Sequence, residues 1–246
     1  MAKILKMVAG VLAVPLMFAV THAFYTNVTQ VSELSGILQY FIWGVVSYVV
    51  LHLLFYKPTF VYVLGHEAVH AVMAWMMGGK VHSFQVSKEG GSVSTDKTNT
   101  AIELGPYFVP IYAIVVMAVY FVVAYSYNIN GAVFVFLIGF TLALHLVMTI
   151  EVMKTRQPDI VKSGYFFSIV LVYVLNIIII AMLFGLLFHS FSAKRFFIDA
   201  ALASKSIYGG IVRHLFFCDI RRRSGRVVDC GSLATERSEE VPPNTY

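Results

Sequence analysis

The chain contains little cysteine and little charge. Only two of its 246 residues are cysteine, Cys218 and Cys230, so the first 217 residues contain none. No disulfide can therefore support that part of the chain, and the redox compartment cannot be inferred. Charged residues make up 13% of the sequence, whereas soluble domains carry about 25%. Most of the chain is thus excluded from the class of soluble globular domains.

Long apolar runs take the place of the missing charge. Hydrophobic residues make up 59% of the chain, and the mean hydropathy is +0.78. A transmembrane helix needs about 20 mostly apolar residues, and six runs meet that test: 4–24, 37–56, 58–77, 101–126, 131–153 and 163–189. We predict an all-α polytopic membrane protein with about six transmembrane helices. We expect a multi-pass protein of a plasma (inner) membrane in preference to an internal membrane.

Three sections differ in composition. Residues 1–57 are interpreted as accessory transmembrane helices and residues 58–189 as a transmembrane core. Residues 190–246 contain nine of the eighteen Lys and Arg residues and end in a polar run, which predicts a soluble, partly disordered tail. The first run resembles a secretory signal peptide, but its apolar stretch of about 18 residues exceeds the usual length, which favours a retained helix. The net charge of +5 indicates attraction to anionic lipid, and nothing indicates nucleic acid.

The run 58–77 is followed by a segment of a different pattern. Pro58 is tolerated in a first helical turn and Gly78-Gly79 supplies a stop. In 81–94, apolar and polar residues alternate around Gly90-Gly91, which predicts a short β-hairpin at the membrane surface.

Basic residues in the short loops indicate the orientation. The loops that follow 58–77 and 131–153 each contain three Lys or Arg residues, so both are expected to be cytoplasmic. Lys3, Lys6 and the arginine-rich tail favour the opposite orientation.

Three ionisable residues, His66, Glu67 and His70, lie inside the apolar run 58–77. Residues four apart share one helix face, so the two imidazoles can bind a single metal ion. Glu67 lies one step around the helix, where it can act as general base and then as general acid on water and the leaving amine. Zinc is the expected ion, because catalytic zinc sites use three protein ligands and keep a fourth position open. The alternative is that the histidines only form hydrogen bonds between helices.

A third metal ligand must come from elsewhere in the chain. The available side chains are His82, Glu103, His145, Glu151 and Asp159. Spacing alone does not select among them.

Several short motifs of the sequence resemble those of a known family. The run GHEAVHA, the glycine-containing hairpin, a helix that begins LGP and the later QPD are similar to the intramembrane metalloproteases of the site-2 protease family. The resemblance covers about residues 58–189. In that family an aspartate of the third core helix completes the zinc site, which implies Asp159 as the third ligand.

The predicted function is that of an intramembrane zinc metalloprotease. Zn²⁺ would be bound by His66, His70 and Asp159, Glu67 would be catalytic, and the substrate would be a peptide bond in or near a transmembrane segment of another membrane protein. The alternative is a non-enzymatic membrane protein, either a metal carrier or an inactive relative that binds transmembrane helices. The sequence does not indicate an oligomeric state.

Overall fold

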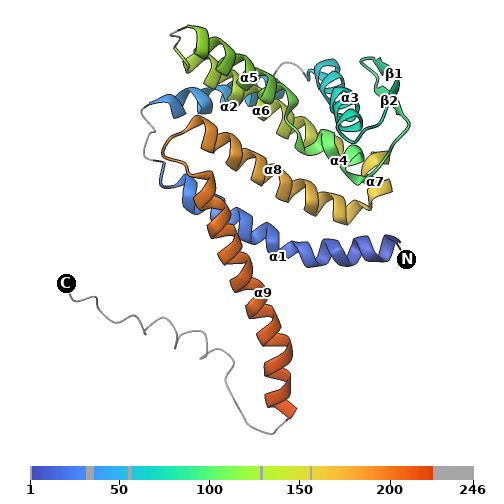
Figure 1. Ribbon diagram of the computed structural model, residues 1–246, viewed down its shortest axis with the longest axis vertical. Coiled ribbons are helices and arrows are strands. Elements are labelled where there is room, and N and C mark those ends of the chain that lie inside the picture. Colours follow the sequence, from blue (N-terminus) through green and yellow to red (C-terminus); the bar gives the residue numbers. More distant parts are fainter. Residues whose placement is uncertain (1, 32–35, 55–56, 128–129, 156, 224–246) are drawn as a thin grey trace, which may run out of the picture.

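The computed structural model describes residues 2–31, 36–54, 57–127, 130–155 and 157–223 (Figure 1). Within these ranges the protein has nine helices and one antiparallel pair of strands. The elements are α1 (Ala2–Val28), α2 (Ile37–Leu54), α3 (Thr59–Met76), β1 (Val81–Val86), β2 (Gly91–Thr95), α4 (Thr100–Phe108), α5 (Ile111–Ser126), α6 (Ala132–Met153), α7 (Pro158–Ser163), α8 (Tyr165–Leu187) and α9 (Ala193–Arg223). The predicted helical architecture with one short hairpin is therefore present.

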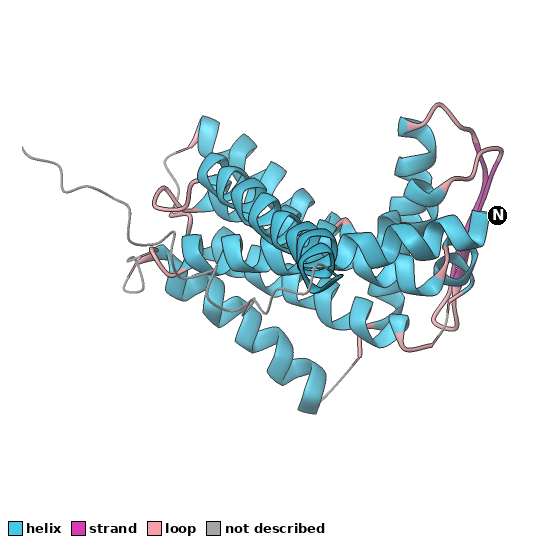
Figure 2. Ribbon diagram, turned by 90° about the horizontal axis from the view of Figure 1, so that it is seen from below, coloured by secondary structure: helices cyan, strands magenta, loops and turns pink. Residues whose placement is uncertain are grey.

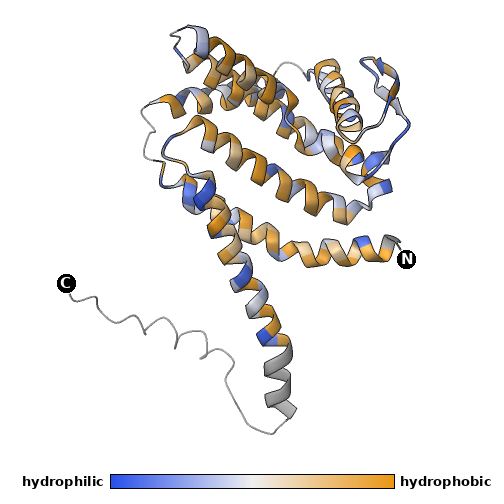
Figure 3. Ribbon diagram, viewed as in Figure 1, coloured by the Kyte–Doolittle hydropathy of each residue, from blue (hydrophilic) through white to orange (hydrophobic). Residues whose placement is uncertain are grey.

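Four helices are long and apolar enough to cross a membrane. They are α1 from Ile4 onward, α2, α6 and α8, and the number becomes five if α4 and α5 form one broken span. These helices indicate a membrane protein, and Figure 3 shows that most of their residues are hydrophobic. Helix α3 is not among them, because its two histidines and one glutamate lower the mean hydropathy of an 18-residue segment. The sequence-based number of about six spans thus exceeds the number that length and composition support.

The predicted run 101–126 is divided into two helices. Helices α4 and α5 meet at a bend of 69°, and Pro110 lies at the break, where it begins α5. A proline lacks the N–H that would continue the ladder of α4, so the helix ends before it. The bend turns α4 toward α3 and away from the direction of α5 (Figure 1).

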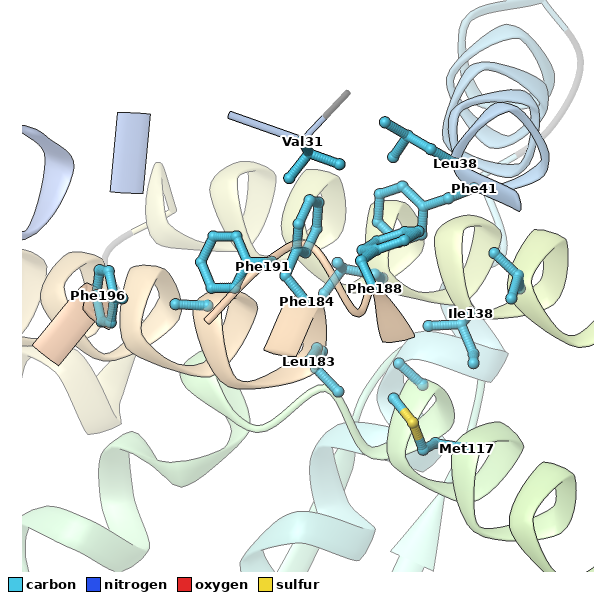
Figure 4. Close-up of a cluster of buried hydrophobic side chains, with 14 of the residues drawn as sticks. Val31, Leu38, Phe41, Met117, Ile138, Leu183, Phe184, Phe188, Phe191 and Phe196 are labelled. Carbon is cyan, nitrogen blue, oxygen red and sulfur yellow. The ribbon is translucent and has the colours of Figure 1, made fainter. Parts of the chain in front are cut away.

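The apolar core lies where α1, α2, α5, α6 and α8 meet, and the start of α9 adds Phe196 and Ala200. Figure 4 shows its aromatic centre, in which Phe41, Phe184 and Phe188 pack edge to face at centroid distances of 5.0–6.0 Å. Helices α2 and α6 approach closely at Gly44 and Gly139, where a Cβ atom on either glycine would meet the backbone of the other helix. Small residues permit such close approach between membrane helices.

Helix α3, the hairpin, α4 and α7 form a second region at one end of the bundle (Figures 1 and 2). Helix α3 packs mainly against α4 and the two strands. It ends at Gly78, whose φ of +70° is a conformation that glycine adopts without strain. The backbone N–H of Lys80 then donates to Asp96 Oδ1 at 2.6 Å, which joins the two ends of the hairpin beside the end of α3.

The predicted soluble tail contains a long helix that the sequence analysis did not anticipate. Helix α9 packs its first half against α1, where Asn27 donates to Asp199 and Tyr208 donates to the carbonyl of Leu12. Its Phe196 is fully buried. Residues 224–246 lie outside the described residues, so the solubility and partial disorder predicted for 190–246 stay predictions.

Candidate metal centre

The two histidines of the motif share one face of α3, as the spacing predicts. The rings of His66 and His70 lie 4.9 Å apart between centroids, and each side chain is mostly covered, with exposed fractions of 11% and 14%. The face turns toward the region between α4 and α7 and away from the outside of the bundle. Both imidazoles therefore point into the protein.

Asp159 is the third member of the cluster. It lies in the first turn of α7, a short helix that begins at Pro158, in a segment expected to be a polar loop. Its Oδ2 atom is 3.5 Å from His70 Nε2 and 3.9 Å from His66 Nε2. The ligand atoms of the three residues all lie within 4.8 Å of one another.

These distances fit a tetrahedral metal site. Ligands about 2.1 Å from zinc in a tetrahedron stand roughly 3.4 Å apart. The two distances from Asp159 exceed this value by 0.5 Å or less, and no two of the three ligand atoms are more than 4.8 Å apart, so an adjustment of the side chains would bring them around one metal ion. Two imidazoles and one carboxylate leave a fourth position open, as in catalytic zinc sites. The residues present thus fit a divalent metal, although the geometry does not identify the element.

His70 is held in the orientation that metal binding requires. Its Nδ1–H donates to the carbonyl of Ile102 at 2.9 Å, which leaves the lone pair of Nε2 directed at Asp159. Ile102 belongs to the first turn of α4, and Asn99 caps this helix by accepting the N–H of Ile102 at 2.9 Å. The cap of α4 therefore fixes the position of the carbonyl that orients His70.

The electrostatics of Asp159 also favour a ligand role. Burial acts to raise the pKa of this carboxyl group, but the neighbouring imidazoles of His66 and His70 hold its pKa well below the usual range. The side chain is therefore a carboxylate at neutral pH, the form that binds a cation.

Glu67 lies beside the three ligands and under the hairpin. The residue is only 7% exposed. Strand β2 passes so close that a Cβ atom on Gly91 would be 2.5 Å from Glu67 Cγ and 2.9 Å from Glu67 Oε1. Any larger residue at position 91 would displace the strand or the carboxylate, so the glycine sets the approach of the hairpin to Glu67.

A cavity of about 760 Å³ opens at this point. Its wall includes the side chains of His66, Glu67, His70 and Asp159 on one side and residues 88–95 of the hairpin on the other. Lys88, Lys162 and Glu103 also line it. The four predicted site residues thus share one cavity that is large enough for a peptide segment.

The other possible ligands are not members of the three-residue cluster. His82 is exposed on β1. The Glu103 carboxylate accepts the hydroxyl of Ser163 at 2.5 Å. Glu151 contacts Lys57 at 2.7 Å and His52 at 3.3 Å. His145 is buried in α6 and lines a second, much smaller cavity next to His66.

Sequence reasoning missed two features of the site. The contact between Gly91 and Glu67 joins residues 24 positions apart, and only the glycine pair itself could have signalled a close approach. Tyr62 and Tyr107 pack their rings against His66 at 5.7 Å and 5.1 Å. Tyr62 precedes His66 by one helical turn, so its position on the same face was available from the spacing.

Comparisons with known proteins give no match: no protein-family model fits the chain, and no curated protein or solved structure is similar to it. The resemblance to the site-2 protease family therefore rests on the short motifs alone. The geometry of the cluster is therefore the main indication of function.

Proposed function

We propose that this protein is a zinc-dependent endopeptidase that hydrolyses peptide bonds in or near transmembrane segments of other membrane proteins. The observation that carries the proposal is the joint placement of two imidazoles, one carboxylate from a distant helix and a further buried glutamate around one cavity. The first three supply a metal site, and the fourth supplies a proton acceptor beside it.

The chemistry follows from these positions. Zinc, when bound by His66, His70 and Asp159, would lower the pKa of a coordinated water to about 7. Glu67 would take the proton of the attacking water and return it to the nitrogen of the leaving amine, so that one carboxylate acts first as base and then as acid. The low exposure of Glu67 supports this role, since few bulk waters compete for its oxygens.

The hairpin supports an extended substrate. A helical segment hides its carbonyls in its own hydrogen bonds and must unwind before hydrolysis. Strand β2 pairs with β1 along one edge and lines the cavity with residues 91–95. In the described part of the chain its other edge pairs with no strand, and an unwound substrate can add to such an edge by backbone hydrogen bonds.

The membrane placement is part of the proposal. With α3 as one span and the bent pair of α4 and α5 as another, the described helices give six spans together with α1, α2, α6 and α8. His66 and His70 lie about 11 Å and 17 Å along α3 from Thr59 at a rise of about 1.5 Å per residue. Buried ionisable residues at such depth are typical of functional sites in membrane proteins. A plasma (inner) membrane, in preference to an internal membrane, is likewise part of the proposal.

The test uses the full-length protein purified in detergent. Metal content is measured for the wild type and for Glu67→Gln, and cleavage is assayed with a panel of labelled single-span membrane proteins and with unstructured casein. We expect zinc in both proteins and cleavage by the wild type, lowered by roughly 10²–10⁴-fold in Glu67→Gln, the range for loss of a general base.

Each alternative gives a different result. Absence of metal from the wild type would leave only interhelical hydrogen bonds for the histidines. Bound metal without cleavage of any substrate would favour a carrier or an inactive helix-binding relative. Equal cleavage by Glu67→Gln would contradict the role given to Glu67.

A further inference from the structure

Five buried side-chain atoms in the described part of the chain have no hydrogen-bond partner. They are Tyr62 Oη, His66 Nδ1, Tyr107 Oη, His145 Nε2 and Thr149 Oγ1. They come from α3, α4 and α6, and one of them belongs to His66 of the candidate metal centre. Native proteins leave few buried polar atoms without a partner, so five such atoms on three neighbouring helices require a physical reason.

The members of this group, here called the inner polar cluster, are close neighbours. The rings of Tyr62 and Tyr107 lie 5.7 Å and 5.1 Å from that of His66. The hydroxyls of Tyr62 and Thr149 lie close to each other without the geometry of a direct hydrogen bond. His145 lies near His66, and it also neighbours the side chain of Asn176 and the backbone of Tyr107. Of the five residues, Tyr62, His66 and His145 line the same small interior cavity.

A small cavity occupies this region. Its volume is about 10 Å³, and its polar lining residues include Tyr62, His66 and His145. A volume of roughly 10–15 Å³ is the least that holds one water molecule, and such a water needs two to four polar partners. The cavity meets both conditions.

The two histidines of the proposed metal site differ in the hydrogen-bond partner of their Nδ1 atoms. The Nδ1–H of His70 donates to the carbonyl of Ile102. Nδ1 of His66 is buried and meets no protein acceptor among the described residues. Metal-binding histidines almost always donate their second N–H to a carbonyl, a carboxylate or a water, which fixes the tautomer.

We propose that one buried water in this cavity is the outer hydrogen-bond partner of His66, held by Tyr62 and His145. The inference rests on the proposed metal site, and it makes Tyr62 and His145 positioning residues for His66. The water accepts the Nδ1–H of His66 and keeps its Nε2 directed at Asp159, as the carbonyl of Ile102 does for His70.

The alternative is a dry cluster with unmade hydrogen bonds. Removal of an unpaired buried hydroxyl is neutral or stabilising, whereas removal of a hydroxyl that binds water leaves the water with fewer partners. Tyr62→Phe therefore separates the two cases. A dry cluster predicts a metal-free protein of equal or greater thermal stability and unchanged zinc affinity.

The experiment measures zinc affinity in the full-length protein by competition with a chromogenic chelator, without any activity assay. We expect Tyr62→Phe to weaken zinc binding by roughly 10–100-fold, the effect of losing an outer-shell partner. Tyr48→Phe is the matched control, because Tyr48 is a fully buried phenol whose hydroxyl pairs with His52 on the same helix. It should leave the zinc affinity unchanged.

A second pair of variants guards against a general loss of folding. His145→Gln keeps a group that can hydrogen-bond the water and should retain most of the zinc affinity, whereas His145→Leu should lose it to the same extent as Tyr62→Phe. The visible absorption of the Co²⁺-loaded proteins should show a changed ligand field only in Tyr62→Phe and His145→Leu.

The outcomes separate this inference from the proposed function. Equal zinc affinity in the wild type, Tyr62→Phe and His145→Leu overturns the inference and leaves the metal site intact. Zinc binding that responds to these variants in a protein that cleaves no substrate supports the inference and counts against the protease. A wild type that binds no zinc overturns both.

Discussion

The apolar bundle and the region around the candidate metal centre are stabilised by different interactions. In the bundle, α6 and α8 are apolar on all sides, and the interface is made of interlocking aromatic rings around Phe184. In the region around the candidate metal centre, α3 is less apolar, and specific hydrogen bonds accepted by Asn99, Ile102 and Asp96 define the positions of its neighbours. Apolar packing tolerates exchange of similar side chains, whereas the second region depends on single atoms.

The largest difference between the two regions is expected on removal of Asp159, the proposed ligand that lies outside α3. We expect Asp159→Ala to lose the bound metal and all cleavage, because two imidazoles alone do not complete the site. The bundle should remain folded, since Asp159 takes no part in the apolar core. Metal analysis and circular dichroism of the purified variant test both statements.

Asp199→Ala provides the control for that variant, because this carboxylate lies on α9 beside Asn27. Equal metal content in the wild type and Asp159→Ala would remove Asp159 from the site.

A substitution in the bundle should lower the stability of the fold and leave zinc binding unchanged. Phe184→Ala opens a cavity among four neighbouring rings, those of Phe24, Phe41, Phe188 and Phe191. We expect a loss of about 3 kcal/mol in the free energy of unfolding, as for other buried aromatic residues, with unchanged zinc affinity. Chemical denaturation in detergent and chelator competition measure the two quantities.

Phe121→Ala, at an exposed ring on α5, should change the stability much less. A fall in zinc affinity in Phe184→Ala as large as the fall in stability would show that the two regions are one cooperative unit.

Gly91 tests the contact between the hairpin and Glu67. Gly91→Ala places a methyl group against the carboxylate, and a displacement of about 1 Å can lower turnover by roughly 10²-fold. Zinc content should not change, because the three metal ligands lie on α3 and α7. Gly209→Ala is the control, since a Cβ atom there meets nothing. Full activity of Gly91→Ala would mean that the strand does not approach Glu67 in the working protein.

The smallest effect concerns the hydrogen bond at the base of the hairpin. The pKa of Asp96 is lowered, chiefly because its carboxylate accepts the backbone N–H of Lys80. A lowered pKa contributes stability that is complete above the ordinary value of 3.8 and is lost as the pH falls through the lowered pKa. At a pH below the lowered pKa of Asp96, the hairpin should become more susceptible to pepsin than it is at pH 5.

Asp96→Asn, compared at each pH to correct for the protease itself, should remove this dependence on pH. A digestion rate with the same pH profile in both proteins would show that the contact does not stabilise the hairpin.

The features that were predictable from the sequence are those set by local spacing. The helix with His66 and His70 on one face, the hairpin around Gly90-Gly91 and the apolar helices follow from periodicity and turn residues. The partner Asp159 was selected through a resemblance, and it lies in the same cluster. Its function as a ligand stays a prediction.

Features that depend on contacts between distant residues were not predictable. The bend between α4 and α5 was signalled by Pro110, but its angle depends on how α4 packs against α3. The helical form of residues 193–223 was not predicted. These residues are too polar on average for a membrane span, so they were interpreted as part of a soluble tail. The inner polar cluster joins side chains from three helices, and no local pattern connects them.

The hydrogen bond between Lys80 and Asp96 ties strand β2 to the end of the helix that carries Glu67. A peptide laid along the edge of this strand would be held in one frame relative to the carboxylate. Since alternate residues of an extended chain face opposite sides, sliding by one residue would turn every side chain over, while sliding by two would restore the pattern. Secondary cleavage products should therefore differ in length by even numbers of residues.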